Sequence, residues 1–315
     1  MRIVRGLPSY PREAAPSAVA LGVFDGVHLG HRAILGTATA RAAAAGLTSI
    51  ACTFDPHPME VLHPGQAPVL ITTLEERLEL MAESGLDTTL VLTFDAELAA
   101  LEPETFVKDV LVDRLRAAEV VVGFNHRFGR GARGDARLLE GLGQRIGFQV
   151  HVVPPLAVDG VPVSSTEIRG ALRRGDLAAA ARLLGRPYFV RGVVTRGAGR
   201  GRTLGFPTAN LAPDRPLLVP TGVYACGARV DGAAYAAVVN VGVRPTFESA
   251  GIVVEAHLLD AALDLYGRRL ALDFVARLRE ERKFPSVEDL RAQIARDVEA
   301  ARARLRSLYF PATPC

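Results

Sequence analysis

Two histidines, His28 and His31, stand where an apolar run gives way to an alanine-rich stretch of helical character. The segment reads Gly22-Val23-Phe24-Asp25-Gly26-Val27-His28-Leu29-Gly30-His31. The first turn of a helix carries unpaired N–H groups and the positive end of the macrodipole, so it attracts anions. Two imidazoles three residues apart share one face and can both donate N–H to one polyphosphate, while Gly30 leaves room for its approach. The segment predicts a nucleotide-binding loop.

Taken alone, the two histidines have simpler interpretations. They could be surface or core-edge histidines, because short motifs recur by accident. They could also belong to a metal site, but no cluster of Cys or carboxylates stands at ligand spacing beside them. A pair at this spacing would supply at most two ligands. The longer pattern G-x-F-D-G-x-H-x-G-H is far more specific and favours the nucleotide.

Three later segments could complete a nucleotide site. Residues 53–58, Thr-Phe-Asp-Pro-His-Pro, are stiffened by two prolines and offer rings to a planar ligand. Residues 123–129, Gly-Phe-Asn-His-Arg-Phe-Gly, add an amide, a guanidinium and an aromatic ring, a set suited to ribose, phosphate and base. Residues 164–169, Ser-Ser-Thr-Glu-Ile-Arg, open a helix with hydroxyls near its N-cap. Singly, these segments could equally be a rigid loop, a solvated basic loop and an ordinary cap.

The first half of the chain alternates strand-like and helix-like segments. Apolar runs predict strands at residues 18–24, 48–54, 88–93, 119–122 and 149–153, with helices at 31–45, 73–84, 103–115 and 135–146. This order predicts an α/β fold with a doubly wound parallel sheet. Ligands of such sheets bind beyond the carboxyl ends of the strands, so the first three candidate loops should converge on one crevice.

Together the four segments resemble the adenylyltransferase domain of prokaryotic FAD synthetases, within the nucleotidylyltransferase superfamily. The match runs from Gly22 to about Arg169, and the last segment is similar to the S-S-T-x-I-R loop of that family. The chain departs from the family at His126, where an aromatic residue is common. The resemblance implies adenylylation of FMN by ATP, with catalytic roles for His28, His31, Asn125, Ser165, Thr166 and Arg169. It also implies nucleotide or flavin contacts for Gly22, Phe24, Asp25, Gly30, Pro56, Pro58, Arg127 and Phe128.

A second candidate site lies in a glycine-rich segment at residues 197–210. Its glycines permit a backbone that folds tightly around phosphate oxygens, and its arginines supply positive charge: Gly197, Gly199, Gly201, Gly205, Arg200 and Arg202. No Lys-Ser/Thr follows, so this is not a Walker A loop. An RGG-like RNA-binding segment would predict repeats and disorder, whereas this segment runs into Pro-Thr-Ala-Asn. In an extended segment Thr208 and Asn210 point to one side, so their oxygens can coordinate one hard cation, most naturally Mg²⁺.

The second half of the chain changes in character after an alanine-rich helix that ends at Gly185-Arg186-Pro187. We expect a domain boundary near Pro187, with one domain over 1–186 and another over 187–315. Beyond it, short runs at 189–195, 222–230, 234–241, 252–258 and 271–278, separated by Gly and Pro, predict a small antiparallel β-barrel. A closing helix is expected over 286–305, with acids interleaved among its arginines.

This half resembles riboflavin kinase. The landmarks are the PTAN segment and residues 240–247, 253–257 and 278–284, which together cover nearly all of 191–305. The resemblance implies that Glu255 is the base for the ribityl 5′-hydroxyl, that Thr208 and Asn210 hold the metal, and that Arg279 contacts the flavin. Without the resemblance, Glu255 would be an outward-facing strand residue. The family commonly has Pro at the position of Glu280.

Composition is consistent with this assignment and narrows the alternatives. The chain has 315 residues, 49% of them apolar and 23% charged, which suits two globular domains. A net charge of +3 is too small to indicate nucleic-acid binding. Three scattered cysteines, Cys52, Cys226 and Cys315, form neither a disulfide framework nor a metal knuckle, and no apolar run approaches a bilayer span. We expect a cytoplasmic protein without membrane or nucleic-acid partners, and a homo-oligomer is left open.

The sequence therefore predicts a bifunctional enzyme of flavin biosynthesis. Its substrates and products would be riboflavin, FMN, FAD and ATP, with Mg²⁺ as the metal cofactor. A different nucleotidylyltransferase acting on another phosphorylated substrate would share His28 and His31 but would not explain the PTAN barrel. A nucleic-acid-binding protein would explain the arginines of the glycine-rich loop but not the paired loops of the first half.

Overall fold

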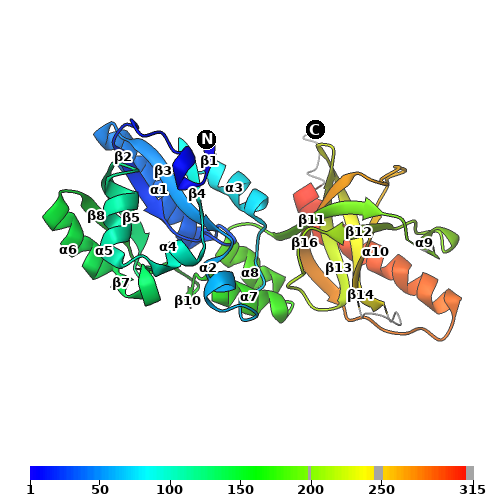
Figure 1. Ribbon diagram of the computed structural model, residues 1–315. Coiled ribbons are helices and arrows are strands. Elements are labelled where there is room, and N and C mark those ends of the chain that lie inside the picture. The colour runs from blue at the N-terminus through cyan, green and yellow to red at the C-terminus, as the bar shows by residue number, and fades with distance from the viewer. Residues whose placement is uncertain (198–199, 245–250, 310–315) are drawn as a thin grey trace. The chain divides into compact units, whose positions relative to one another are not determined.

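The computed structural model describes the whole chain except residues 198–199, 245–250 and 310–315 (Figure 1). By its internal contacts the chain divides into two compact units, Met1–Ser165 and Thr166–Cys315. This division falls at the start of α7 (Ser165–Arg173), which is followed by α8 (Leu177–Leu184). The boundary expected at Pro187 lies after both helices, and it stays a prediction about which part of the chain folds alone.

The first unit is built on a six-stranded sheet in which every pair of neighbours is parallel. Its strand order is β1 (Arg2–Arg5), β4 (Thr88–Thr93), β3 (Thr48–Asp55), β2 (Ser17–Leu21), β5 (Ala117–Gly123) and β8 (Gln149–Val153). The chain moves from β2 to β3 and β4 on one side and to β5 and β8 on the other. The order therefore reverses between β2 and β5, and this is where doubly wound sheets bind their ligands.

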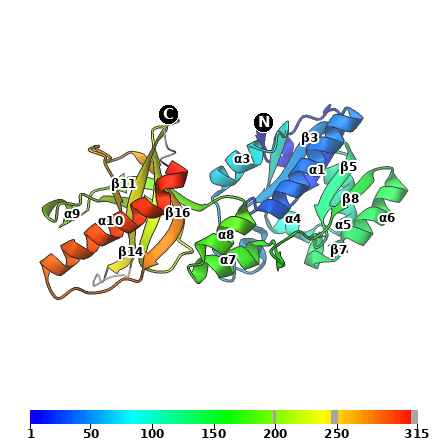
Figure 2. The same cartoon turned by 180° about the vertical axis from the view of Figure 1, so that it is seen from behind.

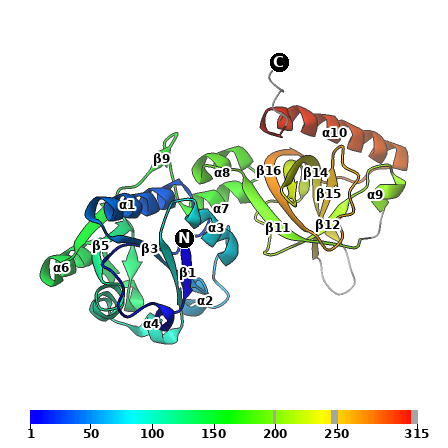
Figure 3. The same cartoon turned by 90° about the horizontal axis from the view of Figure 1, so that it is seen from above.

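Helices cover both faces of this sheet, as the view from above shows (Figure 3). On one face α1 (Leu29–Ala45) packs on β2, β3 and β5. On the other face the residues that pack on the strands include Phe106, Val110 and Leu111, together with Leu139 and Leu142 of α6 (Ala136–Ile146). The remaining elements are α2 (Pro58–Leu62), α3 (Leu74–Ala82), α4 (Ala96–Ala100), α5 (Pro103–Thr105), the ribbons β6 (Arg127–Phe128) with β7 (Gly134–Asp135) and β9 (Ala157–Val158) with β10 (Val161–Pro162), and short 3₁₀ turns at Leu7–Ser9 and Arg130–Ala132.

Local sequence signals explain where these helices begin and end. The helix α1 ends at Gly46 in the left-handed conformation that suits glycine, and α6 ends in the same way at Gly147. Thr73 and Glu76 form a capping box at the start of α3. The helix expected over residues 103–115 is instead α5 followed by a π-helical stretch at Phe106–Val112. Hydrophobic periodicity marks the buried face but does not separate these two helix types over so short a length.

The second unit contains a closed barrel of six antiparallel strands. In barrel order they are β11 (Tyr188–Thr195), β12 (Ala209–Pro213), β15 (Gly251–Leu258), β14 (Ala233–Arg244), β13 (Gly222–Val230) and β16 (Arg269–Arg279). The long helix α10 (Val287–Tyr309) crosses the barrel (Figure 2) and packs on β13, β14 and β16. Its Ala301 and Leu305 are buried against Val223 and Val238. A single helical turn, α9 (Arg200–Thr203), follows β11.

The predicted fold class is confirmed in both halves. All ten predicted strands are present. The strands that were not predicted are β1 in the sheet, β12 in the barrel and the short ribbons β6, β7, β9 and β10. The first predicted strand is shorter than expected, since it ends at Leu21 and the chain turns sharply at Phe24, whose φ is 57°. Within the described ranges, no helix is long and apolar enough to cross a bilayer.

Candidate active sites

The predicted nucleotide loop of the first unit joins β2 to α1 at the carboxyl edge of the sheet. His28 is the N-cap of α1, and its Nδ1 accepts the backbone N–H of His31 at 3.2 Å. The two imidazoles stack, with ring centroids 3.5 Å apart, and the edge of Phe24 contacts His31. Gly30 lies against the His28 ring, where an added Cβ would come within 3.2 Å of it. The fold thus brings both histidines to the first turn of the helix, as the spacing predicts.

Asp25 holds this loop in an unusual backbone conformation. Phe24, Gly26 and Val27 all have positive φ, of 57°, 82° and 39°, which is costly for residues other than glycine. The buried carboxylate of Asp25 accepts the N–H groups of Ile71 and Thr72 at 3.0–3.1 Å and the Thr72 hydroxyl at 3.2 Å. The N–H of Gly26 donates to the same hydroxyl at 3.0 Å. The structure therefore assigns Asp25 to loop geometry, and its predicted contact with a ligand stays a prediction.

Gly22 and the proline-rich loop lie at the carboxyl ends of β2 and β3. A Cβ at Gly22 would stand 3.0 Å from the Phe24 ring, so that ring packs directly on the strand end. Pro56 and Pro58 are half-buried, and the peptide bond before Pro56 is cis. Nδ1 of His57 accepts the N–H of Met59 at 3.1 Å and caps α2, which begins at Pro58.

The loop after β5 exposes some of its predicted residues and buries others. Asn125 and Arg127 are exposed, and the Arg127 guanidinium lies 3.8 Å from Asp135. Phe128 is only 8% exposed and packs on Phe106 in the core, whereas Phe124 is 54% exposed. The accessible ring in this loop is therefore that of Phe124. A ligand contact by Phe128 stays a prediction.

His126, in the same loop, is half-buried. Its ring stacks on Phe128 with centroids 5.8 Å apart, and its Nε2 is buried with no hydrogen-bond partner in the described part of the chain. Burial lowers the pKa of His126 to about 4. The imidazole is therefore neutral near pH 7 and packs as an aromatic ring.

The predicted Ser-Ser-Thr-Glu-Ile-Arg segment forms the start of α7. The Ser165 hydroxyl donates to the carbonyl oxygen of Asp25 at 3.1 Å, which ties the beginning of this helix to the nucleotide loop. Thr166 is exposed and Arg169 is buried farther along the same helix. Their catalytic roles stay predictions.

In the second unit, strand register places Glu255 between two asparagines. On β15 it pairs with Asn210 of β12 on one side and with Asn240 of β14 on the other. Residues directly opposite each other in antiparallel strands point to the same face, so the three side chains form one row. Glu255 and Asn240 both line a groove of about 1190 Å³. Asn240 lies in a family landmark but was not predicted as a site residue, because only register reveals that it neighbours Glu255.

The glycine-rich segment lies directly against the two predicted metal ligands. A Cβ on Gly197 would stand 2.1 Å from Nδ2 of Asn210, and a Cβ on Gly201 would stand 2.9 Å from Oγ1 of Thr208. Only glycine permits such an approach. Gly205 turns the chain after α9 with a φ of 86°. Gly199, the side chain of Arg200 and the landmark residues 245–247 lie outside the described parts.

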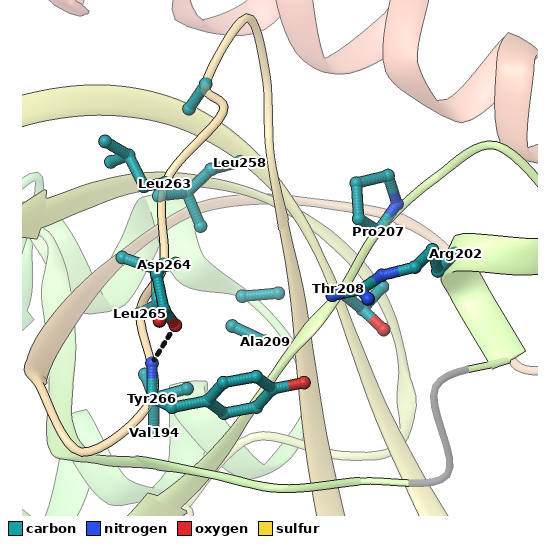
Figure 4. A pocket seen from close by; sticks show the side chains of 12 residues that line it. Val194, Arg202, Pro207, Thr208, Ala209, Leu258, Leu263, Asp264, Leu265 and Tyr266 are labelled. Carbon is teal, nitrogen blue, oxygen red and sulfur yellow. Dashed lines mark hydrogen bonds between the residues drawn. The ribbon is translucent and has the colours of Figure 1, made fainter.

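Thr208 lines two cavities. The groove that contains Glu255 also has apolar walls from the barrel, α10 and the segment before it, including Phe206, Val253, Phe284, Leu290 and Ile294. A second cavity, of about 370 Å³, is lined by Thr208, Arg202, Asp264, Tyr266 and apolar residues. Figure 4 shows Arg202 extending toward Thr208, with Tyr266 projecting its ring from the opposite wall. Thr208 belongs to the lining of both cavities.

His257 fixes the approach to Thr208, and this residue was also missed as a site residue. Its Nδ1 donates to the carbonyl oxygen of Pro207 at 2.8 Å, and its ring meets Phe206 edge to face at 5.6 Å. Both contacts hold the segment just before Thr208. A histidine on a strand gives no local signal of such a role, because its partner lies on a distant loop.

Arg279, predicted to contact the flavin, is held from behind by α10. Its Nε and Nη2 donate to the carboxylate of the buried Asp297 at 2.8–3.1 Å, and Gln293 donates to the same carboxylate at 2.7 Å. Its guanidinium also lies 5.6 Å from the centroid of the Phe284 ring. Arg279 and Asp297 both line the larger groove, so the arginine is positioned there even though its flavin contact stays a prediction.

These features define a class of ATP-dependent transferase with two sites on one chain. One site is a helix N-terminus with paired histidines on a doubly wound sheet. The other is a glycine-rich loop and a carboxylate on an antiparallel barrel. Within the described residues there is no group of three or more His, Cys, Asp or Glu side chains that could hold a metal ion. Any metal in the barrel site would be bound through hydroxyl and amide oxygens and through the substrate.

Comparison with known proteins agrees with this division. The FAD synthetase family model matches residues 10–167, and the riboflavin kinase family model matches residues 184–305. The bifunctional riboflavin kinase/FMN adenylyltransferase of Escherichia coli K12 is 39% identical over 304 residues, covering 96% of this chain and 97% of its own. The protein of the same name from Bacillus subtilis 168 is 38% identical over 295 residues, with 92% of each chain covered. The chain belongs to the bifunctional riboflavin kinase/FMN adenylyltransferase family.

A solved structure shares the whole fold. It comes from Streptococcus pneumoniae, is titled a macrolide-efflux protein, and superposes with a TM-score of 0.88 at 29% identity. The likeness covers 96% of this chain and 99% of the other. The two family models and the curated relatives confirm the predicted family and the predicted pair of activities. ATP, riboflavin, FMN and FAD follow from those activities as substrates and products.

Proposed function

We propose that the barrel phosphorylates riboflavin at the row formed by Asn210, Glu255 and Asn240, and that the α/β unit adenylylates the resulting FMN at the loop containing His28 and His31. The observation that carries this proposal is that Thr208 lines two cavities. Phosphoryl transfer between two substrates requires neighbouring sites, because donor and acceptor must meet in line.

The residues at the junction fit Mg²⁺. Thr208 and Asn210 offer hard oxygen donors without a carboxylate pair, which suits an ion that takes its other ligands from phosphates and water. Gly197 and Gly201 leave the space beside these two side chains that a Cβ would fill. When bound, Mg²⁺ would neutralise charge on the transferring phosphates.

The two cavities suit different substrates. The larger groove has aromatic and aliphatic walls and contains Glu255, as expected for an isoalloxazine ring with its ribityl chain reaching the carboxylate. The smaller cavity contains Arg202 and Tyr266, which suit a phosphate and an aromatic base. Glu255 would orient the ribityl 5′-hydroxyl and accept its proton as the γ-phosphoryl group is transferred.

The α/β unit needs only to position phosphates. The FMN phosphate would attack the α-phosphorus of ATP in line, and pyrophosphate would leave without a covalent enzyme intermediate. His28 and His31 would donate to the triphosphate at the N-terminus of α1, where the macrodipole also favours anions. The remaining predicted residues would bind the phosphates and stabilise the charge that develops in the transition state. They are Asn125, Ser165, Thr166 and Arg169.

Separation of the two activities tests the proposal. His31→Ala should stop FAD formation while FMN accumulates from riboflavin, and Asn210→Ala should stop FMN formation while supplied FMN is still converted to FAD. Chromatography of mixtures with Mg·ATP measures both products. His63→Ala, which changes an exposed histidine at the end of α2, is the control and should retain both activities. Loss of both activities from either site variant, in a protein that still folds, would contradict the two-site proposal.

A further inference from the structure

Arg77 is a buried charge beneath the adenylyl-transfer loops, and neither the motifs nor the proposed reaction accounts for it. It lies on α3 and is 4% exposed. Its Nη1 donates to the carbonyl oxygen of Val23 at 2.7 Å, and its Nη2 donates to that of Phe54 at 3.0 Å. Val23 follows β2 and opens the histidine loop, while Phe54 is the last residue but one of β3 and belongs to the proline-rich segment 53–58. One guanidinium thus joins the starts of two substrate loops.

Burying this charge is unfavourable, so its position requires a compensating role. Burial lowers the pKa of Arg77, and nearby Asp25 and Asp55 act in the opposite direction. An arginine nevertheless stays protonated in proteins. Its Nε is buried and has no hydrogen-bond partner among the residues that the structure describes. A buried ion normally costs several kcal/mol unless it is well compensated, and a fork that spans two strand ends is the geometry that a guanidinium supplies and an ammonium does not.

The same helix region binds the histidine loop a second time. Ile71 and Thr72, just before α3, hold the carboxylate of Asp25, and Thr72 also accepts the N–H of Gly26. The loop between Val23 and His28, with its positive φ values, is therefore fixed from α3 at its first residue and again in its middle. His28 and His31 follow immediately, so their position depends on these anchors.

We propose that Arg77 is a positioning residue for adenylyl transfer, which locks the histidine loop to the proline-rich loop through the carbonyl oxygens of Val23 and Phe54. The inference rests on the proposed function of those loops. The Thr53 hydroxyl also donates to the Val23 carbonyl oxygen, at 3.0 Å, but Arg77 holds both loops from α3. Loss of Arg77 therefore changes the handling of both ATP and FMN. A residue that supported only one loop would alter the KM of one substrate.

Arg77→Met removes the fork while keeping a long apolar side chain. We expect kcat/KM for FAD formation to fall about 10²-fold, the effect of a misplacement of about 1 Å in a phosphoryl-transfer site, with the KM of both ATP and FMN raised. Arg77→Lys keeps the charge but not the planar fork, so its activity should lie between those of Arg77→Met and the wild type. Riboflavin phosphorylation, measured in the same samples, should stay unchanged.

Arg41→Met is the matched control, because it removes another guanidinium from the same unit. Arg41 donates to Glu119 through Nε at 2.6 Å and Nη2 at 3.0 Å. Glu119 pairs with Ala18 at the start of β2, which is the opposite end of that strand from the histidine loop. The control should lower the unfolding temperature and leave the KM values for ATP and FMN unchanged.

The outcomes separate this inference from the proposed function. If the unmodified protein makes no FAD from supplied FMN, the proposed function fails. If the unmodified protein is active but Arg77→Met and Arg77→Lys both stay within about threefold of it, or change only as Arg41→Met does, the positioning role is wrong. If Arg77→Met does not fold, the kcat and KM values of Arg77→Lys decide, because that variant retains the buried charge.

Discussion

The substitution Gly197→Ala tests the barrel site most directly. The new Cβ would stand 2.1 Å from Nδ2 and 2.4 Å from Cγ of Asn210, whereas real Cβ contacts are essentially never shorter than 3.0 Å. The amide would have to retreat by about 1 Å, and a shift of that size costs about 10²-fold in rate when it misplaces a reacting group. We therefore expect FMN formation to slow by about 10²-fold and to need a higher Mg²⁺ concentration for its half-maximal rate.

Initial rates of FMN formation across a Mg²⁺ titration measure this effect, and FAD formation from supplied FMN in the same sample reports on the intact α/β unit. Gly251→Ala is the control, because it adds the same methyl group to the same barrel at a place where, among the described residues other than its chain neighbours, no atom lies within 4 Å. A Gly197→Ala rate within about threefold of the unmodified protein at every Mg²⁺ concentration would refute the assignment of Asn210. An equal loss in Gly251→Ala would show that the effect is not specific to the site.

Three further predictions follow from the same features. Glu255→Gln keeps the shape of the side chain but loses the proton acceptor, so riboflavin and Mg·ATP should still bind by calorimetry while the rate of FMN formation drops about 10²- to 10⁴-fold. A rate that drops by less than about threefold would show that another group is the base. The isolated fragment 187–315 should phosphorylate riboflavin. The longer fragment 166–315 should melt at a higher temperature, because α8 packs on β11 and β16. A folded fragment that binds ATP without making FMN would contradict the kinase assignment. Burial lowers the pKa of His126 to about 4 in the folded protein, whereas its pKa in the unfolded chain is about 6.5. Between these two values the unfolded chain binds a proton at His126 and the folded protein does not. Stability should therefore fall from pH 6.5 to pH 4, and melting curves of His126→Phe, which keeps a ring against Phe128, should show a smaller fall.

Most of the fold could be predicted because each element carries its own signal. Apolar runs marked the central strands, and Gly, Pro and capping residues marked their ends. The strand β1 was missed because Arg2–Arg5 has only four residues, in which two arginines flank two adjacent apolar residues at a sheet edge. The strand β12 was missed because it has five residues and ends at Pro213, and its pairing with β11 and β15 is what makes it part of the barrel.

The candidate sites divide in the same way into local and non-local parts. The spacing of His28 and His31 could be interpreted from sequence because a helix fixes it within one turn. The placement of Asn240 beside Glu255 could not, since it depends on the register of two strands whose connection includes residues 245–250. Arg77 carried no signal at all, because an arginine in an amphipathic helix is usually a solvated residue. Its partners are backbone carbonyl oxygens, which every residue possesses.

Motif residues themselves fall into two classes that sequence does not separate. His28 and His31 stand at the first turn of α1, where a helix attracts anions. Asp25 and Arg279 instead use their charged groups on internal partners, the former on Ile71 and Thr72 and the latter on Asp297. A buried charge with several short hydrogen bonds has little capacity left for a substrate, and its removal leaves polar groups unsatisfied. A polar residue in a catalytic motif can therefore be required for the geometry of its neighbours, and burial together with hydrogen-bond partners distinguishes the two roles.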